Sequence, residues 1–207
     1  MVTHSTTSNT DGFVQYPEAT DLIGFASTDM IISTTDSSGA TISVSSDSAT
    51  DCSSCSVTHG GVTVVETSGG NYGNAIVAYL TSSTPFSGIQ EADGNGSEAT
   101  TLLPESELDQ LYYIPTNAVY VAVACIETGP TITLTLENDG STFSGTCTSS
   151  PDSVLFTAST LGYSAIDAGS SIEVTSGDDA VFAYYENSST NGETNLWGMK
   201  AHRQHTY

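Results

Sequence analysis

The sequence predicts an all-β protein, an antiparallel β-sandwich or jelly-roll barrel of about 8–12 short strands with little helix. Three observations support this prediction. Residues 118–126 are apolar on both alternations, as in a strand covered on both faces. Residues 131–137 alternate strictly, with isoleucine and leucine on one side and threonine on the other. The remaining apolar runs are short and separated by Gly, Asn, Asp and Pro, and none is long enough for a helical crossover.

The two strongest runs are joined by a short connector, residues 127–130, which contains Gly129 and Pro130. Two strands linked in this way are typical of a hairpin. We therefore predict that residues 118–126 and 131–137 pair with each other at the centre of the core sheet.

The first half of the chain alternates between short apolar runs and polar loops. Strands are expected at 22–25, 30–33, 41–45, 62–65 and 75–80. A polar loop is expected at 46–56, around Cys52 and Cys55. Residues 81–110 have the weakest pattern, with one short helix expected at 105–111.

The second half continues with regular spacing after the central pair of strands. A turn is expected at 138–140, and strands at 142–147, 154–158, 171–175 and 180–185, followed by an apolar piece at 196–200. We expect an N-terminal arm at 1–20, a β-sandwich or jelly-roll domain at 21–199 and a basic tail at 200–207. A split near residue 100 into two small β domains is the alternative.

The chain is strongly acidic. It has 24 acids against two bases, a formal net charge of −22. Nucleic-acid and anionic-membrane partners are excluded, because both need clustered Lys and Arg. Many carboxylates with almost no lysine are typical of proteins from saturated salt, since at molar salt the Debye length is already only about 3 Å and self-repulsion is screened. A merely acidic secreted protein is the alternative. We expect neither a signal peptide nor a membrane-inserted segment, since no run has the required pattern.

The four cysteines lack the paired spacing of a structural zinc site. Cys52 and Cys55 with His59 form the nearest candidate, but Cys125 and Cys147 stand too far apart to complete it. The favoured interpretation is two disulfides, Cys52–Cys55 and Cys125–Cys147. Free buried thiols and zinc remain alternatives.

No residue pattern indicates catalysis. His59 is the one histidine in the body of the chain, and no Gly-x-Ser-x-Gly elbow or phosphate-binding loop occurs. Carboxylates are plentiful, but sugar-cleaving sites usually add aromatic and basic residues, and the chain has one Trp and two bases. We therefore expect no enzyme, cofactor or metal site.

Both bases lie at the C-terminus, where Lys200, His202 and Arg203 occur within residues 200–207. A basic tail on an acidic body is either an end lying on its own molecule or an arm that binds an identical neighbour. Together with Phe13 and Tyr16 of the N-terminal segment, these residues are the candidates for interface arms.

Residues 177–189, Gly-Asp-Asp-Ala-Val-Phe-Ala-Tyr-Tyr-Glu-Asn-Ser-Ser, and 196–202, Leu-Trp-Gly-Met-Lys-Ala-His, stand in a lysine-poor, Ser/Thr/Asp-rich chain. In these segments and in this composition, the chain resembles β-rich structural proteins of haloarchaeal viruses, namely the single-jelly-roll capsid proteins and the turret or spike proteins. The resemblance implies a virion subunit that associates with itself and with other virion proteins.

Beside a secreted or intracellular enzyme, which would need a deep pocket with perturbed carboxylates, two further function classes remain open. The first is a cell-surface or extracellular β-domain, such as a filament subunit, an S-layer-associated protein or an adhesin. The second is a carbohydrate-binding β-sandwich, which would line up tyrosines on one exposed face. Its candidates are Tyr112, Tyr113, Tyr120, Tyr184 and Tyr185, for which a place in the core or in an interface is the favoured alternative.

Overall fold

The computed structural model describes residues 2–5, 12–15, 18–25, 29–48, 50–66, 76–91, 99–177, 179–190 and 192–199, with the backbone alone at 2–5, 12–15, 91 and 99. Across these residues the elements are seventeen strands, one 3-10 turn and one four-residue helix. All the strand pairs are antiparallel, which confirms the predicted fold class. The described residues include no helix that is both long and apolar enough to span a membrane.

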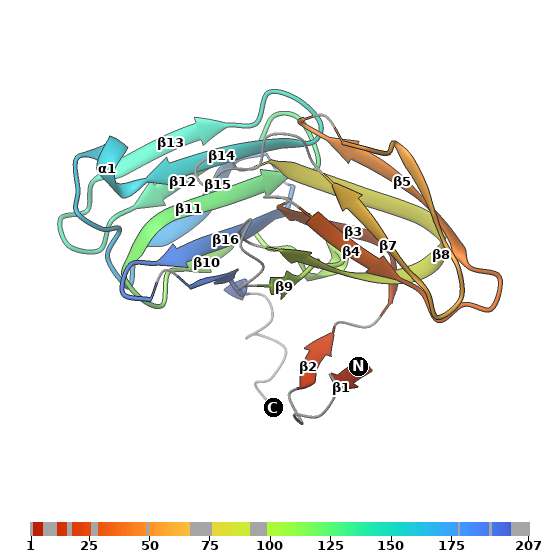
Figure 1. Ribbon diagram of the computed structural model, residues 1–207. Coiled ribbons are helices and arrows are strands. Elements are labelled where there is room, and N and C mark those ends of the chain that lie inside the picture. Colours follow the sequence, from red (N-terminus) through yellow and green to blue (C-terminus); the bar gives the residue numbers. More distant parts are fainter. Residues whose placement is uncertain are drawn as a thin grey trace, which may run out of the picture.

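The strands from β3 to β9 form a barrel, shown on the right in Figure 1. Its strands are β3 (Ala19–Phe25), β4 (Asp29–Ser33), β5 (Ala40–Ser46), β6 (Ser54–Val57), β7 (Val62–Glu66), β8 (Val77–Glu91) and β9 (Ala99–Thr101). Their hydrogen-bonded order is β6-β5-β8-β4-β7, with β3 and β9 also paired to β8. Apolar side chains from this set, including Ile32, Ile42 and Phe86, fill its interior.

Strand β8 closes this barrel because each of its halves has its own neighbours. Residues 77–81 lie between β3 and β5, whereas residues near 87–91 lie between β4 and β9. Ile23 of β3 exchanges two backbone hydrogen bonds, of 2.8 and 2.9 Å, with Leu103, which follows β9. The result is a nearly closed barrel.

The later strands form a sandwich of two four-stranded sheets, on the left in Figure 1. They are β10 (Leu111–Tyr113), β11 (Ala118–Cys125), β12 (Thr131–Thr135), β13 (Thr142–Thr146), β14 (Asp152–Thr157), β15 (Ser171–Ser176), β16 (Val181–Asn187) and β17 (Glu193–Asn195), with helix α1 (Ala158–Leu161) after β14. One sheet has the order β10-β15-β12-β13 and the other β14-β11-β16-β17. A shared apolar core, to which Val123, Leu134 and Ile172 belong, lies between them.

The predicted central hairpin is wrong. Strand β11 pairs with β14 and β16, whereas β12 pairs with β13 and β15 in the other sheet. Both edges of β11 are therefore occupied, and the connector carries the chain across the sandwich. Gly129 has φ +119°, a conformation that favours glycine, and Pro130 has no N–H to donate.

The prediction that β11 is covered on both faces is confirmed. Val121 and Val123 point into the sandwich core. Ala122 and Ala124 belong to a second apolar cluster, which also contains Phe25 and Val77 of the barrel. Strand β11 thus lies between the sandwich interior and the seam where the barrel packs against the sandwich.

Three other expectations are corrected. Residues 81–91, expected to be weakly structured, continue β8, because hydrogen bonds to neighbouring strands outweigh their polar sequence. The expected loop at 46–56 contains β6, which pairs with β5. The expected helix at 105–111 is reduced to a 3-10 turn, η1 (Glu105–Glu107), because Leu108 is buried and the chain enters β10 at Leu111.

The expected N-terminal arm contains a backbone hairpin, in which β1 (Val2–Ser5) pairs with β2 (Gly12–Gln15). Phe13 lies in β2 opposite His4. Tyr16, Lys200, His202 and Arg203 lie outside the described residues. Their role as interface arms stays a prediction, as does the placing of the domain boundaries.

Candidate functional site

The outer surface of the β12 sheet is an array of hydroxyl groups. We call it the hydroxyl face; it comprises Thr131, Thr133, Thr135, Thr142, Ser144, Thr146, Ser171 and Thr175. The strict alternation of β12 directs its isoleucine and leucine into the core and its threonines outward. Thr133 Oγ1 lies 2.9 Å from Ser144 Oγ and 2.9 Å from Thr175 Oγ1, and the Oγ1 atoms of Thr131 and Thr146 are 3.0 Å apart.

Strand β13 forms one edge of this sheet and runs along the upper rim of the molecule in Figure 1. Leu136 N donates to Ser141 O and Cys147 N donates to Pro130 O, so hydrogen-bonded pairs flank β13 at both ends. Because such pairs alternate in an antiparallel ladder, the backbone N–H and C=O groups of Thr142, Ser144 and Thr146 point away from β12. No other described strand pairs with them.

The β13 edge carries no charge. Proteins usually blunt exposed edges with charged side chains or proline, and β13, with the sequence Thr-Phe-Ser-Gly-Thr, has neither. Gly145 allows β13 to lie close to β14, because a Cβ there would be 2.4 Å from Val154 Cγ1. One acid, Glu173 on β15, lies on the hydroxyl face itself, between Ser171 and Thr175 and opposite Thr133.

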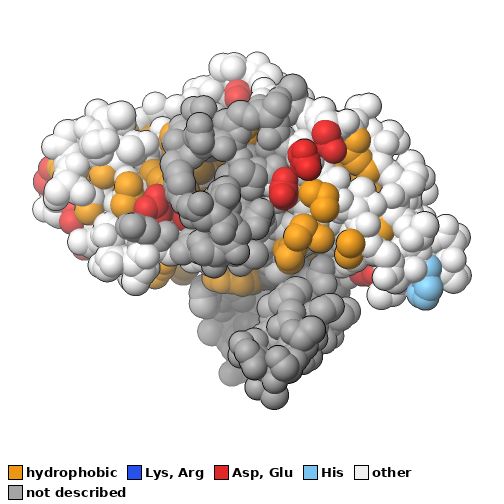
Figure 2. Space-filling model, viewed as in Figure 1, with side chains coloured by type: hydrophobic (Ala, Val, Ile, Leu, Met, Phe, Trp, Pro, Cys, Tyr) orange, Lys and Arg blue, Asp and Glu red, His pale blue; other side chains and the backbone are white. Residues whose placement is uncertain are grey.

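Elsewhere the described acids lie mainly in turns and at strand ends. Figure 2 shows them as separate red groups between uncharged surfaces, with no Lys or Arg side chain among the described residues. Asp152, at the start of β14, is one example. Burial opposes the ionised form, but hydrogen bonds from the N–H groups of Thr148, Ser149 and Ser153 outweigh it, so the pKa of Asp152 is lowered.

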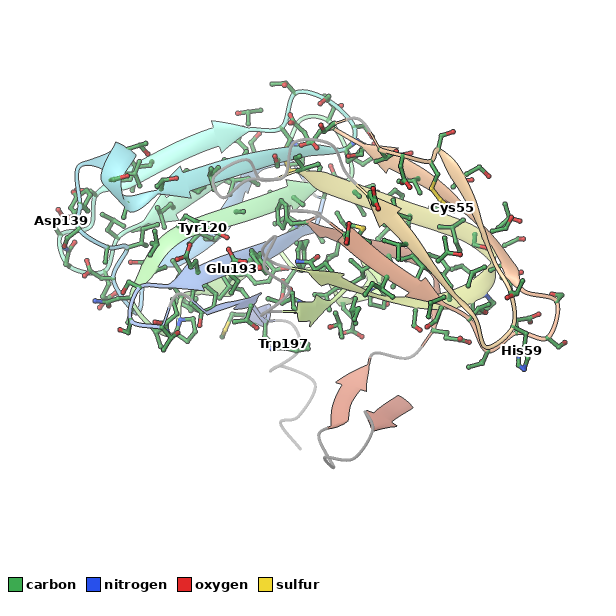
Figure 3. The ribbon with its side chains drawn as sticks, viewed as in Figure 1. Cys55, His59, Tyr120, Asp139, Glu193 and Trp197 are labelled. Carbon is green, nitrogen blue, oxygen red and sulfur yellow. A yellow bond between two sulfur atoms is a disulfide. The ribbon has the colours of Figure 1, made fainter. Side chains whose placement is uncertain are left out.

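A second feature lies at the opposite edge of the β12 sheet. There the edge strand β10 and strand β17 of the other sheet leave an open groove. We call it the aromatic groove; its volume is about 320 Å³, and its lining is Tyr113, Pro115, Tyr185, Thr194, Asn195, Leu196, Trp197 and Met199. Tyr113 and Trp197 are 47% and 53% exposed, although both are large apolar side chains. Figure 3 shows Trp197 on the lower rim of the molecule.

A buried polar cluster lies in the seam. Glu193 of β17 accepts hydrogen bonds from the hydroxyls of Tyr120 and Tyr184, the latter at 2.9 Å. Figure 3 shows Tyr120 and Glu193 close together in the middle of the molecule. Asn195 Nδ2 donates to Thr101 O of the barrel at 2.8 Å. These bonds tie β17 to β11, β16 and β9.

The cysteines form two disulfides, Cys52–Cys55 and Cys125–Cys147, with Cα–Cα distances of 6.0 and 6.4 Å. The first lies in the barrel just before and within β6. The second connects the end of β11 to the residue after β13, and so joins the two sheets of the sandwich. His59, at the far end of the barrel in Figure 3, is exposed and contributes to no metal-binding group of His, Cys, Asp or Glu within the described residues.

A polar hollow of about 510 Å³ lies beside His59 and includes Ser38, Thr58 and Thr84. Next to it, the hydroxyl and N–H of Ser38 both donate to Asp36, and these bonds lower the pKa of Asp36. The arrangement is that of a hydrogen-bonded turn, in which the Gly39 N–H also donates to Asp36 O.

Of the five candidate tyrosines, the structure exposes one. Tyr112, Tyr120, Tyr184 and Tyr185 are buried, and Tyr113 points outward into the aromatic groove. The sequence prediction did not single out Trp197 or the uncharged β13 edge as candidate functional features. The absence of any charge in residues 141–147 was the signal that could have indicated the edge.

Comparison with known proteins gives no relative: no protein-family model, no curated protein and no solved structure matches the chain.

Proposed function

We propose that this chain is a structural subunit that assembles with copies of itself in concentrated salt, as a capsid, turret or spike component of a virus with a halophilic host. The observation that carries the proposal is the uncharged edge of β13. Two copies of the chain, each with a net charge of −22, repel each other. They can come into contact only through a surface without acids, and only where salt screens the acids on the rest of the surface. The β13 edge meets the first condition, and the one acid of the adjoining hydroxyl face, Glu173, lies two strands away from that edge.

Antiparallel pairing of β13 with β13 of a second copy satisfies the outward backbone groups of Thr142, Ser144 and Thr146. It joins two four-stranded sheets into one continuous sheet, and the contact is symmetric, as in most dimers. Further contacts to other copies and to other virion proteins build the particle. Candidates for these are the terminal segments, with Phe13, Tyr16, Lys200, His202 and Arg203.

The two disulfides support a second candidate function, a subunit of a cell-surface filament, layer or adhesin. Disulfides persist on cell surfaces as well as on virions. Assembly through the β13 edge serves either role, and electron microscopy of the native source material distinguishes a particle from a filament.

The test is Ser144→Pro. Among the backbone groups it removes only the N–H that points away from β12, and proline is tolerated on an edge strand at such a position. It also removes the Ser144 hydroxyl, which lies 2.9 Å from Thr133 Oγ1. We expect the native chain to form dimers or larger assemblies at about 1 M salt and above, and to dissociate at about 0.1 M, where charges act over about 10 Å. Ser144→Pro should stay monomeric at high salt. Light scattering after size-exclusion chromatography measures both.

The matched control is Ser144→Ala, which keeps the N–H and should assemble like the native chain. Circular dichroism confirms that both variants are folded. Assembly of Ser144→Pro at native levels would overturn the proposed interface, and a native chain that is monomeric at every salt concentration would overturn self-assembly.

A further inference from the structure

We propose that the aromatic groove binds a neutral oligosaccharide, with the rings of Tyr113 and Trp197 as its stacking surfaces. This binding site is separate from the β13 edge, because strands β15 and β12 lie between β10 and β13. At about 4.8 Å between neighbouring strands, the two sites are roughly 14 Å apart across the sheet. The inference does not depend on the proposed function.

The exposure of the two rings is the first argument. Tyr112, Tyr120 and Tyr185 are almost completely buried, yet Trp197 and Tyr113 leave about half of their surfaces in water at the same concave site. Exposed aromatic rings that gather in a hollow, rather than scatter singly over the surface, indicate a binding site. A volume of about 320 Å³ is within the range of small-ligand pockets.

The lining selects the class of ligand. All eight lining residues are uncharged, in a chain with 24 acids. A cationic ligand would find no carboxylate in the groove, and an anionic ligand would be repelled by the net charge of −22. The ligand is therefore neutral.

The mixture of aromatic and polar groups favours a sugar over a purely apolar ligand. The C–H faces of a sugar ring stack on the electron-rich faces of Tyr and Trp. Its hydroxyls can exchange hydrogen bonds with the exposed Thr194 and with the Tyr113 hydroxyl at the same site.

The sheet beside the groove extends the site. Tyr113 is the register partner of Ser171 in β15, which is in turn the partner of Thr135 in β12. A row of hydroxyls therefore leads away from the rings, one for each strand, about 4.8 Å apart. This row suits an extended chain of two or three sugar units better than a monosaccharide, and it offers nothing to a lipid tail.

Trp197 is the sole tryptophan of the chain, so its fluorescence reports directly on the groove. The probes are neutral trisaccharides of α-linked glucose, β-linked glucose, β-linked N-acetylglucosamine, α-linked mannose and β-linked galactose, titrated at high salt. We expect a saturable change in the Trp197 emission with at least one of them. Tyr113→Ala should weaken that binding at least about tenfold, which corresponds to about 1.4 kcal/mol.

Three further variants complete the test. Val62→Ala, an exposed apolar position on the barrel, should bind like the native chain. Trp197→Phe, followed by calorimetry, should retain most of the affinity, and Trp197→Ala should lose it. Ser144→Pro should bind normally, so that failure of the assembly proposal and failure of this one are distinguishable.

Three results would overturn the inference: no saturable change with any trisaccharide, an unchanged affinity in Tyr113→Ala, or an emission that follows protein concentration instead of sugar. The last would show that a second copy of the chain occupies the groove.

Discussion

The barrel and the sandwich handle the edges of their sheets differently. In the barrel, β3 meets the segment after β9, and Thr63 Oγ1 of β7 donates to Ser56 O of β6 at 2.7 Å, so the barrel is nearly closed. In the sandwich, two sheets stack on a common core and β13 keeps an edge that no other described strand covers. Closure abolishes edges, whereas stacking retains them. The sandwich is therefore the part suited to strand-to-strand association.

The largest expected effect tests whether barrel and sandwich are one cooperative structure. Phe182 of β16 is fully buried in the seam, where its ring centroid is 5.4 Å from that of Phe25 in the barrel. Phe182→Ala should reduce the free energy of unfolding by about 3–5 kcal/mol, because it leaves a cavity between the two parts. Denaturant unfolding at high salt, followed by circular dichroism, measures the loss.

Val62→Ala is the control for this substitution, since the side chain is 68% exposed and its truncation should change stability by less than about 0.5 kcal/mol. A loss below about 1 kcal/mol in Phe182→Ala would mean that the seam contributes little and that the two parts are stable separately.

The disulfide of the sandwich should stabilise the protein more than the disulfide of the barrel. Cys125–Cys147 closes a loop with a sequence separation of 22, and Cys52–Cys55 one with a separation of 3. By loop entropy, replacing both cysteines with serine should cost about 3 kcal/mol in the sandwich and about 2 kcal/mol in the barrel. Thermal unfolding of the two double variants, each compared with the native chain, gives the ranking. A larger loss in the barrel would show that factors other than loop length dominate.

The smallest effect concerns pH. The pKa of Asp152 is lowered by backbone N–H donors in the sandwich, and that of Asp36 by the hydroxyl and N–H of Ser38 in the barrel. A carboxylate whose pKa is lowered on folding stabilises the protein above its unfolded pKa, and this contribution is lost as the pH falls through the folded pKa.

Asp152→Asn should therefore cost roughly 1 kcal/mol near neutral pH and flatten the acid side of the stability curve. Asp36→Asn, at a partly exposed carboxylate that is held by Ser38 alone, should have a smaller effect. Unfolding free energies measured between neutral pH and pH 3 provide the comparison. An acid limb in Asp152→Asn identical to that of the native chain would contradict this role for the carboxylate.

The sequence was sufficient for the fold class and for the environment of single strands. The double apolar alternation of β11 predicted its two buried faces, and the threonine alternation of β12 predicted the half-exposed strand that became the hydroxyl face. Both are local patterns, set by which side chains meet water.

The pairing of the strands and the geometry of the candidate sites could not be predicted from the sequence. The connector with Gly129 and Pro130 looks the same whether it turns within a sheet or crosses between sheets, so the hairpin prediction failed. Alternation required one of Tyr112 and Tyr113 to face outward but did not say which. Glu193 meets Tyr120 from 73 positions away, a distance over which no local pattern carries information.

Strand β8 has a consequence for how the barrel opens. It is a continuous strand of 15 residues with neighbours on both sides of each half. A strand frays from its ends, whereas its middle is released only when the flanking walls separate together. We therefore expect that no side of the barrel unfolds separately, and that its apolar interior becomes exposed to water in one cooperative step.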